Sequence, residues 1–133
     1  MKLTARQPTA KAPESNFTGN VYVDNVAHGD SPTELRVSTV RFSPCARTNW
    51  HCHAHGQTLY VTEGIGRVQA RGGELLEIRP GDTIYTPPGE WHWHGAAPDH
   101  FMSHLAIKDF PNDQSGPDTT WGDPVTDAEY NAL

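Results

Sequence analysis

Two pairs of histidines stand out in this sequence, because the members of each pair are separated by a single residue. His51 and His53 form the first pair, and His92 and His94 form the second, farther along the chain. Successive side chains of a β-strand point to opposite faces, so residues two apart share a face. Imidazole nitrogens bind borderline divalent metals readily. Two strands that each direct paired imidazoles into one cavity would therefore form a metal site.

Gln57 follows the first histidine pair by four residues. Its side-chain carbonyl oxygen is a ligand that suits harder ions than imidazole does. Both stretches end in turns that contain glycine, so each is expected to be a strand of one closed sheet with its ligands directed inward.

The composition restricts the kind of protein that this is. A chain of 133 residues is expected to form one domain. Its formal net charge of -6 argues against nucleic acid and against an anionic membrane surface as partners. Two cysteines, Cys45 and Cys52, are too few for a disulfide framework and indicate free thiols in a reducing compartment. Neither an apolar leader nor an apolar run of about 18 residues is present, so we expect a cytoplasmic protein.

Short β-rich segments separated by glycine and proline turns make up most of the sequence, and an amphipathic helical pattern is missing before residue 120. This pattern predicts an all-β sandwich or barrel. The expected strands are 21–23, 35–42, 51–53, 57–62, 67–70, 75–78, 83–86, 90–94 and 101–107.

Three regions are expected along the chain: a flexible N-terminal arm at 1–16, a barrel at 17–108, and a C-terminal tail at 109–133 that packs on the barrel. The arm could still add to a sheet edge. In the tail, Thr126 and Glu129 have the spacing of a capping box, which predicts a short terminal helix. We expect Trp121 to hold the tail against the barrel.

The histidine stretches match the two motifs of the cupin family. The first motif has the form H-x-H, three or four residues, a carboxylate, six residues and a glycine. Here it is met by His51, His53, Gln57 and Gly64. The second has the form G-x5-P-x-G-x2-H-x3-N. Here it is met by Gly81, Pro87, Gly89 and His92, with Ala96 in place of the final asparagine.

The sequence thus resembles a small single-domain cupin, which implies a double-stranded β-helix, or jelly-roll, barrel. The resemblance also implies that one divalent metal ion is bound by His51, His53, Gln57 and His92. Most metal cupins have glutamate where this chain has Gln57. Four neutral ligands leave the ion with its full +2 charge, so it would be a stronger Lewis acid, would favour an anionic ligand and would be held less tightly.

A narrower resemblance is to the bacterial cupin hydroxynitrile lyases, which themselves resemble the cupin part of carboxymuconolactone-decarboxylase-like proteins. It is carried by residues 47–53, 56–59, 88–97 and 103–107. These lyases split a cyanohydrin, a small molecule, into an aldehyde and HCN. The resemblance implies a glutamine-containing centre that usually holds manganese, with iron, zinc, nickel or cobalt as the other metals to consider.

Cyanohydrin cleavage requires removal of a hydroxyl proton, and an imidazole can accept it near neutral pH. His94 shares a strand face with His92, and His104 shares one with Met102 and Ala106. We predict a catalytic role for both His94 and His104, and the sequence leaves open which of them is the base. Thr48 could bind a substrate oxygen or could instead stabilise its loop.

Other functions are compatible with the same motifs. An Fe(II) cupin dioxygenase would need a redox metal and open coordination positions. A non-catalytic cupin would only bind or sense a small molecule. A decarboxylase or isomerase that acts through an enolate would also suit a +2 ion.

Cys52, Trp91 and Trp93 alternate with the histidines and should point away from them. Cys52 is expected to be a packed small residue. Two tryptophans on the outside of a barrel need cover, either from the arm or tail or from a second subunit. Cupins of this size commonly dimerise, so we predict a homodimer. His55, beside a turn, is expected at the rim or in solvent.

Overall fold

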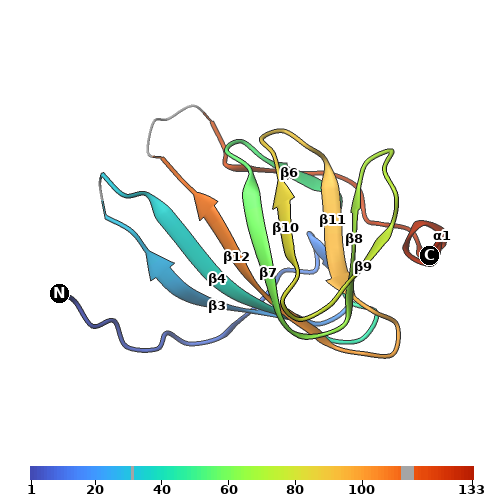
Figure 1. Cartoon of the computed structure of the whole chain (residues 1–133), viewed down its shortest axis with the longest axis horizontal. Helices are drawn as coiled ribbons and strands as arrows, with labels where there is room; N and C mark the ends of the chain where they lie inside the picture. The colour runs from blue at the N-terminus through green and yellow to red at the C-terminus, as the bar shows by residue number, and fades with distance from the viewer. Residues whose placement is uncertain (31, 112–115) are drawn as a thin grey trace.

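Antiparallel β-strands dominate the computed structural model, which describes residues 1–30, 32–111 and 116–133 (Figure 1). The elements are β1 (Ala10–Lys11), β2 (Phe17–Thr18), β3 (Val21–His28), β4 (Leu35–Phe42), β5 (Arg47–Thr48), β6 (His51–His53), β7 (Gln57–Gly64), β8 (Gly66–Ala70), β9 (Leu76–Ile78), β10 (Thr83–Thr86), β11 (His92–Ala96), β12 (Met102–Asp109), β13 (Thr119–Trp121) and α1 (Asp127–Tyr130). The predicted all-β class with a short C-terminal helix is therefore confirmed.

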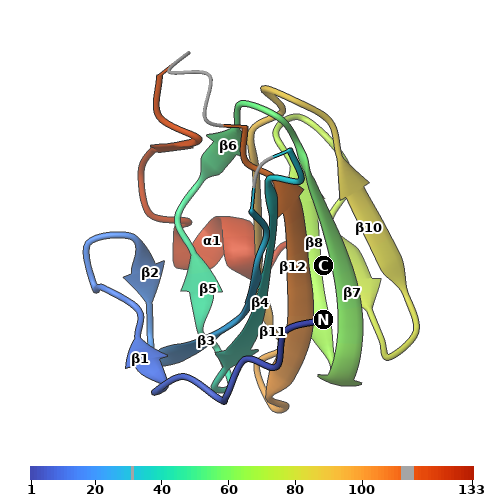
Figure 2. The same ribbon diagram turned by 90° about the vertical axis from the view of Figure 1, so that its left-hand side faces the viewer.

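The strands form two curled sheets around a common interior. One sheet has the strand order β1-β3-β4-β12-β7-β10, and Figure 2 shows β4, β12 and β7 side by side within it. The other has the order β13-β6-β11-β5-β2, and β8 extends it by pairing with β11 on one side and with β9 on the other. The hairpin predicted at residues 71–74 joins β8 to β9.

The interior changes character along the strands. On β12 the inward-facing side chains run from Met102 to His104 and then to Lys108, and their partners on β4 are Phe42, Val40 and Arg36. Met102 and Phe42 belong to a buried apolar core at one end of the interior. His104, Lys108 and Arg36 line a cavity at the other end. One sheet pair thus supplies both the core and part of the site.

Strand limits differ from the expected ones near the second motif. The strand expected at 90–94 begins at His92 and runs to Ala96. Glu90 still belongs to the preceding turn, because its N–H donates to the carbonyl of Pro87 at 3.2 Å. Four short strands lie outside the predicted ones: β1, β2, β5 and β13. Of these, β1 pairs with the edge of β3, and β13 pairs with β6.

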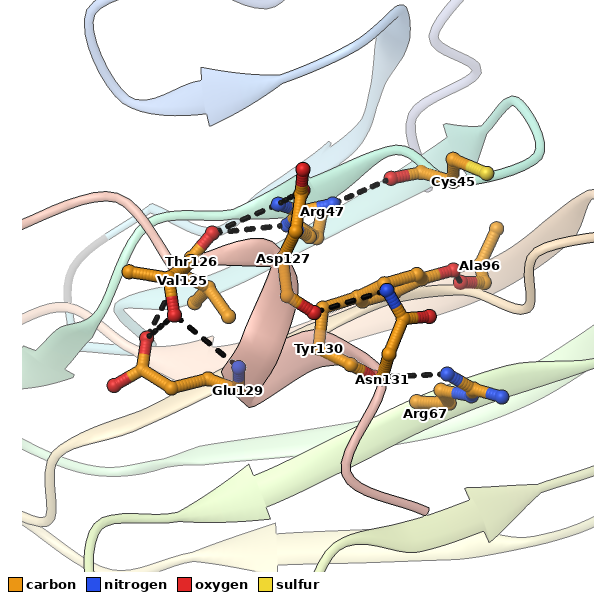
Figure 3. A network of polar contacts seen from close by, with 10 residues as sticks. All are labelled: Cys45, Arg47, Arg67, Ala96, Val125, Thr126, Asp127, Glu129, Tyr130 and Asn131. Atoms are coloured by element: carbon orange, nitrogen blue, oxygen red, sulfur yellow. Dashed lines mark hydrogen bonds and ion pairs between the residues drawn. The ribbon is translucent and has the colours of Figure 1, made fainter.

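The C-terminal helix is short, and its side chains fix it to the barrel (Figure 3). The predicted capping box is present: the Thr126 hydroxyl accepts from the N–H of Glu129, whose carboxylate accepts from the N–H of Thr126. Tyr130 is buried, and its hydroxyl donates to the carbonyl of Ala96 at 2.6 Å. Burial raises the pKa of Tyr130 to about 12, so the hydroxyl stays a donor at any physiological pH.

Two arginines flank the Tyr130 ring. The guanidinium carbons of Arg47 and Arg67 lie 4.5 and 5.0 Å from the ring centroid. Arg47 also donates to the carbonyl of Val125 and to the carboxylate of Asp127, and Arg67 donates to the carbonyl of Tyr130 (Figure 3). Cation–π contacts and hydrogen bonds thus attach the tail to β5 and β8.

The tail covers the outward-pointing tryptophans. Trp93 is fully buried in a cluster with Trp50, Val125 and Tyr130, and Trp91 packs against the same cluster. The prediction that the tail covers the tryptophans is therefore confirmed for Trp93. The alternative that Trp93 lies in a subunit interface is wrong, because the chain's own tail already buries it. The homodimer itself stays a prediction. Among the described residues, no helix has the length and apolar character needed to cross a bilayer.

Candidate metal centre

Three histidines from two neighbouring strands meet in the interior. His51 and His53 share the inner face of β6, and His92 on β11 pairs directly with His51. One ring nitrogen from each histidine lies within 4.8 Å of the others, and all three residues are buried. The predicted metal-binding histidines are thus brought together, and the cluster could hold a metal ion.

Hydrogen bonds fix the orientation of the three imidazole rings. The Nδ1 atoms of His51 and His92 each lie 2.9 Å from a backbone carbonyl, that of Asn49 and that of Glu90. A carbonyl can only accept, so both Nδ1 atoms carry the proton and both Nε2 atoms carry a lone pair. His53 Nδ1 lies 3.1 Å from the hydroxyl oxygen of Thr119. This arrangement is typical of metal-binding histidines, whose second nitrogen is oriented by a hydrogen bond.

Three of the four predicted ligand atoms are buried without a hydrogen-bond partner among the described residues. Nε2 of His53, Nε2 of His92 and Oε1 of Gln57 are buried and accept no hydrogen bond from the described residues. Buried polar atoms without partners are costly, and a bound cation would remove that cost. Three imidazole nitrogens and one amide oxygen are a donor set that fits a divalent ion.

A tight turn delivers Gln57 to this cluster. Gly56 has a φ of 76°, which L-residues rarely adopt, and a Cβ there would lie 2.9 Å from the carbonyl oxygen of Thr86. The turn reverses the chain between β6 and β7, so Gln57 lines the same cavity as His51 and His53. The glycine is therefore needed for the position of the amide ligand.

His94 and His104 lie beside the three-histidine cluster and contact each other. Nε2 of His104 is 3.0 Å from Nδ1 of His94, and both rings are buried. The ring centroids of His94 and His51 are 5.2 Å apart. Nε2 of His94 and Nδ1 of His104 have no hydrogen-bond partner among the described residues. Both predicted catalytic histidines thus line the cavity next to the cluster.

Burial keeps these imidazoles neutral. Removal from water lowers the pKa of His92 and of His104 to about 4. The same cause, reinforced by the neighbouring histidines, lowers the pKa of His51 and of His94 well below the usual value. Their lone pairs are therefore available at neutral pH, whether for a metal or for a proton.

Thr48 is buried and lines the cavity, and its hydroxyl oxygen accepts the N–H of His94 at 3.2 Å. This contact ties β5 to β11 and supports a structural role for Thr48 next to His94, one of the two histidines predicted to be catalytic. His55 is half-buried in the turn after β6, and Cys52 is half-buried on the opposite face of that strand.

The cavity has a volume of about 160 Å³, enough for a small molecule. Apolar side chains such as Val23 and Val40 line it together with Arg36 and Lys108, and its described lining includes no carboxylate. A larger hollow of about 450 Å³ lies between the tail and Arg71, but no histidine lines it. The chemistry of this chain is thus concentrated in the smaller cavity, which favours neutral or anionic ligands.

The sequence did not predict that Arg36, Lys108, Thr119 and Trp121 would line this cavity, or that Asp118 would lie beside it. Thr119 and Trp121 line the cavity from β13, and the Trp121 ring centroid lies 4.8 Å from that of His51. Asp118 lies next to them, with one carboxylate oxygen 3.5 Å from Nδ1 of His53. Burial alone would raise the pKa of Asp118, but hydrogen bonds from His53, Lys108 and Thr119 outweigh it and lower the pKa.

Comparison with known proteins agrees with this geometry. The model of the cupin domain family matches residues 38–106. An (R)-mandelonitrile lyase from Granulicella tundricola is 43% identical over 130 residues, which covers 98% of this chain and 97% of that protein. A cupin-like protein from Thermotoga maritima is 37% identical, with a TM-score of 0.84 over 99% of this chain and 96% of that one.

More distant structures share the fold alone. A polyketide cyclase from Streptomyces resistomycificus has a TM-score of 0.72 at 20% identity, over 98% of this chain and 90% of that chain. The two curled sheets, the inward histidines of both motifs and the relatives at 37% and 43% identity lead to one conclusion. This chain belongs to the cupin family.

Proposed function

We propose that this cupin is a metal-dependent lyase that cleaves and forms small cyanohydrins. The observation that supports this best is the set of unpartnered ligand atoms, on His53, His92 and Gln57, beside the buried pair of His94 and His104. The relative that is named an (R)-mandelonitrile lyase supports the choice of reaction, because it matches nearly the whole chain.

Four residues would hold the metal: His51, His53, Gln57 and His92. The amide oxygen suits a harder ion, and for that reason we propose manganese, with iron, zinc, nickel and cobalt as the alternatives to test. Bound there, the ion would supply Lewis acidity, undiminished by any ligand charge. All other steps fall to side chains of the chain itself.

His94 is the proposed base. Its Nε2 would accept the substrate hydroxyl proton while the carbon–carbon bond to the nitrile breaks, leaving an aldehyde and a cyanide ion that carries away the electron pair. To accept at Nε2, His94 must hold its other proton on Nδ1, where Nε2 of His104 lies 3.0 Å away as the acceptor. His104 would thus stabilise the imidazolium. Transfer of the captured proton to cyanide gives HCN and restores His94.

Charge in the cavity supports an anionic leaving group. Arg36 and Lys108 face each other on β4 and β12, and both line the cavity. Cyanide carries one negative charge as it leaves, and Arg36 would stabilise it, with a smaller contribution from Lys108, whose charge is offset by Asp118.

The test is mandelonitrile cleavage by metal-free protein and by protein reloaded with Mn(II), Fe(II) or Zn(II), with and without oxygen. We expect benzaldehyde and HCN to be released only with metal and at equal rates in both atmospheres. Oxygen-dependent turnover with Fe(II) alone would favour a dioxygenase instead. Tight metal binding without turnover of any cyanohydrin would favour a non-catalytic binding protein.

A further inference from the structure

We propose that Asp118 is a positioning residue for the metal centre: through Thr119 and His53 it supplies the negative charge that Gln57 does not. This inference rests on the proposed metal centre. It assigns to the tail a role in metal affinity, in addition to its packing on the barrel.

The backbone of β13 places Asp118 and Thr119 beside a ligand. β13 pairs with β6 in antiparallel register, and Thr119 is the direct partner of His53. Nδ1 of His53 lies 3.1 Å from the Thr119 hydroxyl oxygen and 3.5 Å from Oδ2 of Asp118. The Thr119 hydroxyl in turn donates to Oδ2 of Asp118 at 3.0 Å. The imidazole N–H therefore leads, through one hydroxyl, to a carboxylate.

This connection fixes the ring and its tautomer. Because the Thr119 hydroxyl gives its proton to Asp118, its oxygen is left to accept the N–H of His53. Nε2 of His53 then carries the lone pair, and it is the atom that is buried without a partner. A carboxylate behind a histidine also makes the ligating nitrogen more basic, and removing such a partner typically costs about 10- to 100-fold in metal affinity.

The charges of the ligands explain why a nearby carboxylate would strengthen metal binding. Gln57 and the three histidines are neutral, so the ligands offset none of the charge of a divalent ion. Asp118 is almost completely buried, with its side chain 6% exposed. Its cationic partner, Lys108, lies 2.5 Å away, but that side chain is 24% exposed and better solvated. Solvent therefore screens the cation more than the anion, and the anion lies 3.5 Å from Nδ1 of His53, so the carboxylate would contribute the larger field at that ring.

An electrostatic role and a packing role for Asp118 predict different results for one pair of variants. If Asp118 merely ties the tail to β6, then Asp118→Asn and Lys108→Met should both weaken metal binding by loosening the same contact. If Asp118 acts through its charge, the two variants should shift the dissociation constant in opposite directions. Asp118→Asn removes a negative charge near the centre, whereas Lys108→Met removes a positive one.

The experiment is titration of purified metal-free protein with Mn(II), with the free ion followed by its electron paramagnetic resonance signal. We expect the dissociation constant to rise about 10- to 100-fold in Asp118→Asn and to fall in Lys108→Met. Adding Gln57→Glu to Asp118→Asn should restore tight binding, because the lost charge returns at the ligand itself. The matched control is Asp127→Asn, which removes another tail carboxylate that is ion-paired to an arginine, Arg47, on a different part of the barrel.

The outcomes separate this proposal from the one on which it rests. Unchanged affinity in Asp118→Asn, or weaker binding in both Asp118→Asn and Lys108→Met, would overturn the role of Asp118 while leaving the metal centre intact. Wild-type protein that binds no Mn(II) and no Zn(II) would remove the metal centre, and this proposal with it. Near-ultraviolet circular dichroism of each metal-free variant identifies any that has lost its packing, and Asp118→Glu then replaces Asp118→Asn, with an expected affinity close to wild type.

Discussion

Nε2 of His104 and Nδ1 of His94 lie 3.0 Å apart in a buried position, so one proton is shared between two imidazoles. The tautomer of each ring therefore constrains the tautomer of the other. The two histidines therefore have different proposed roles: His94 lies next to the metal cluster, and His104 would act through His94.

This division predicts different losses for the two histidines. In His94→Ala the turnover number for mandelonitrile should fall about 10²- to 10⁴-fold, since a general base is removed. His104→Leu should lose less, and His104→Gln less still, because its amide oxygen can accept the Nδ1 proton of His94. Steady-state kinetics at equal metal content measure all three. Greater loss in His104→Leu than in His94→Ala would exchange the two roles.

Removal of a metal-binding histidine should empty the centre. In His51→Ala or His92→Ala, three ligands remain and the buried cluster is broken, so metal content should fall from about one ion per chain to a small fraction of that. Elemental analysis after dialysis measures the content. His100→Ala is the control, because His100 is half-exposed and contacts Asp99 rather than the cavity. Full stoichiometry in the His51 and His92 variants would disprove the ligand assignment.

A carboxylate at position 57 should bind metal more tightly and turn over more slowly. Gln57→Glu brings a negative charge to the ion and lowers its net charge from +2 to +1, which reduces its Lewis acidity. We expect a loss in rate on the order of tenfold, together with a lower metal dissociation constant. Kinetics and metal titration on the same preparation test both effects. An unchanged rate at full metal content would mean that ligand charge does not limit the reaction.

The metal-free protein should lose stability in mild acid. The pKa values of His92 and His104 are lowered to about 4, and those of His51 and His94 also lie below their usual value. The unfolded chain therefore takes up protons near pH 6.5 that the folded chain refuses. The stability present above that pH declines as the pH falls toward 4, by up to about 1.4 kcal/mol per pH unit for each histidine.

Urea unfolding of metal-free protein between pH 8 and pH 5 checks this slope. Hydrogen bonds from Arg41 and Thr9 lower the pKa of Asp24 to about 2. Such carboxylates titrate below pH 5 and therefore contribute little to the slope between pH 8 and pH 5. A flat unfolding free energy from pH 7 to pH 5 would show that the histidines are solvated in the metal-free protein.

Loss of the Tyr130 hydroxyl should loosen the tail. In Tyr130→Phe the carbonyl of Ala96 loses its 2.6 Å hydrogen bond in a buried position, which costs about 1–3 kcal/mol. Thermal and urea unfolding measure the loss. Tyr85→Phe is the control, because Tyr85 is 66% exposed and should change stability by less than about 0.5 kcal/mol. Equal stability of the two variants would mean that the tail contributes little to folding.

The motif histidines were predictable because their placement depends on local geometry. Alternation along a strand puts His51 and His53 on one face, and it correctly puts Trp93 on the other. Gly64, which closes the first motif, has a φ of 78°, and a Cβ there would lie 1.9 Å from the carbonyl oxygen of Phe101. Such steric requirements are properties of the sequence itself, so a spacing pattern detects them.

The tail's share of the cavity was not predictable in the same way. β13 lies in a segment rich in Asp, Pro and Gly that has no period-2 pattern, and Thr119 meets His53 across 66 positions of sequence. That register depends on how the whole tail docks, through Tyr130 and its two arginines. Lys108 is an intermediate case, because extending the alternation of His104 and Ala106 by two residues would have found it.

Because Trp121 contacts His51, the fluorescence of Trp121 is expected to respond to metal binding at the centre. The indole lies over the imidazole with a centroid separation of 4.8 Å, while the other three tryptophans cluster behind β11. A paramagnetic ion bound at His51 would quench the fluorescence of Trp121 far more than that of the others. Intrinsic emission can therefore follow metal loading in real time without any added label, and a Trp121→Phe variant would supply the baseline.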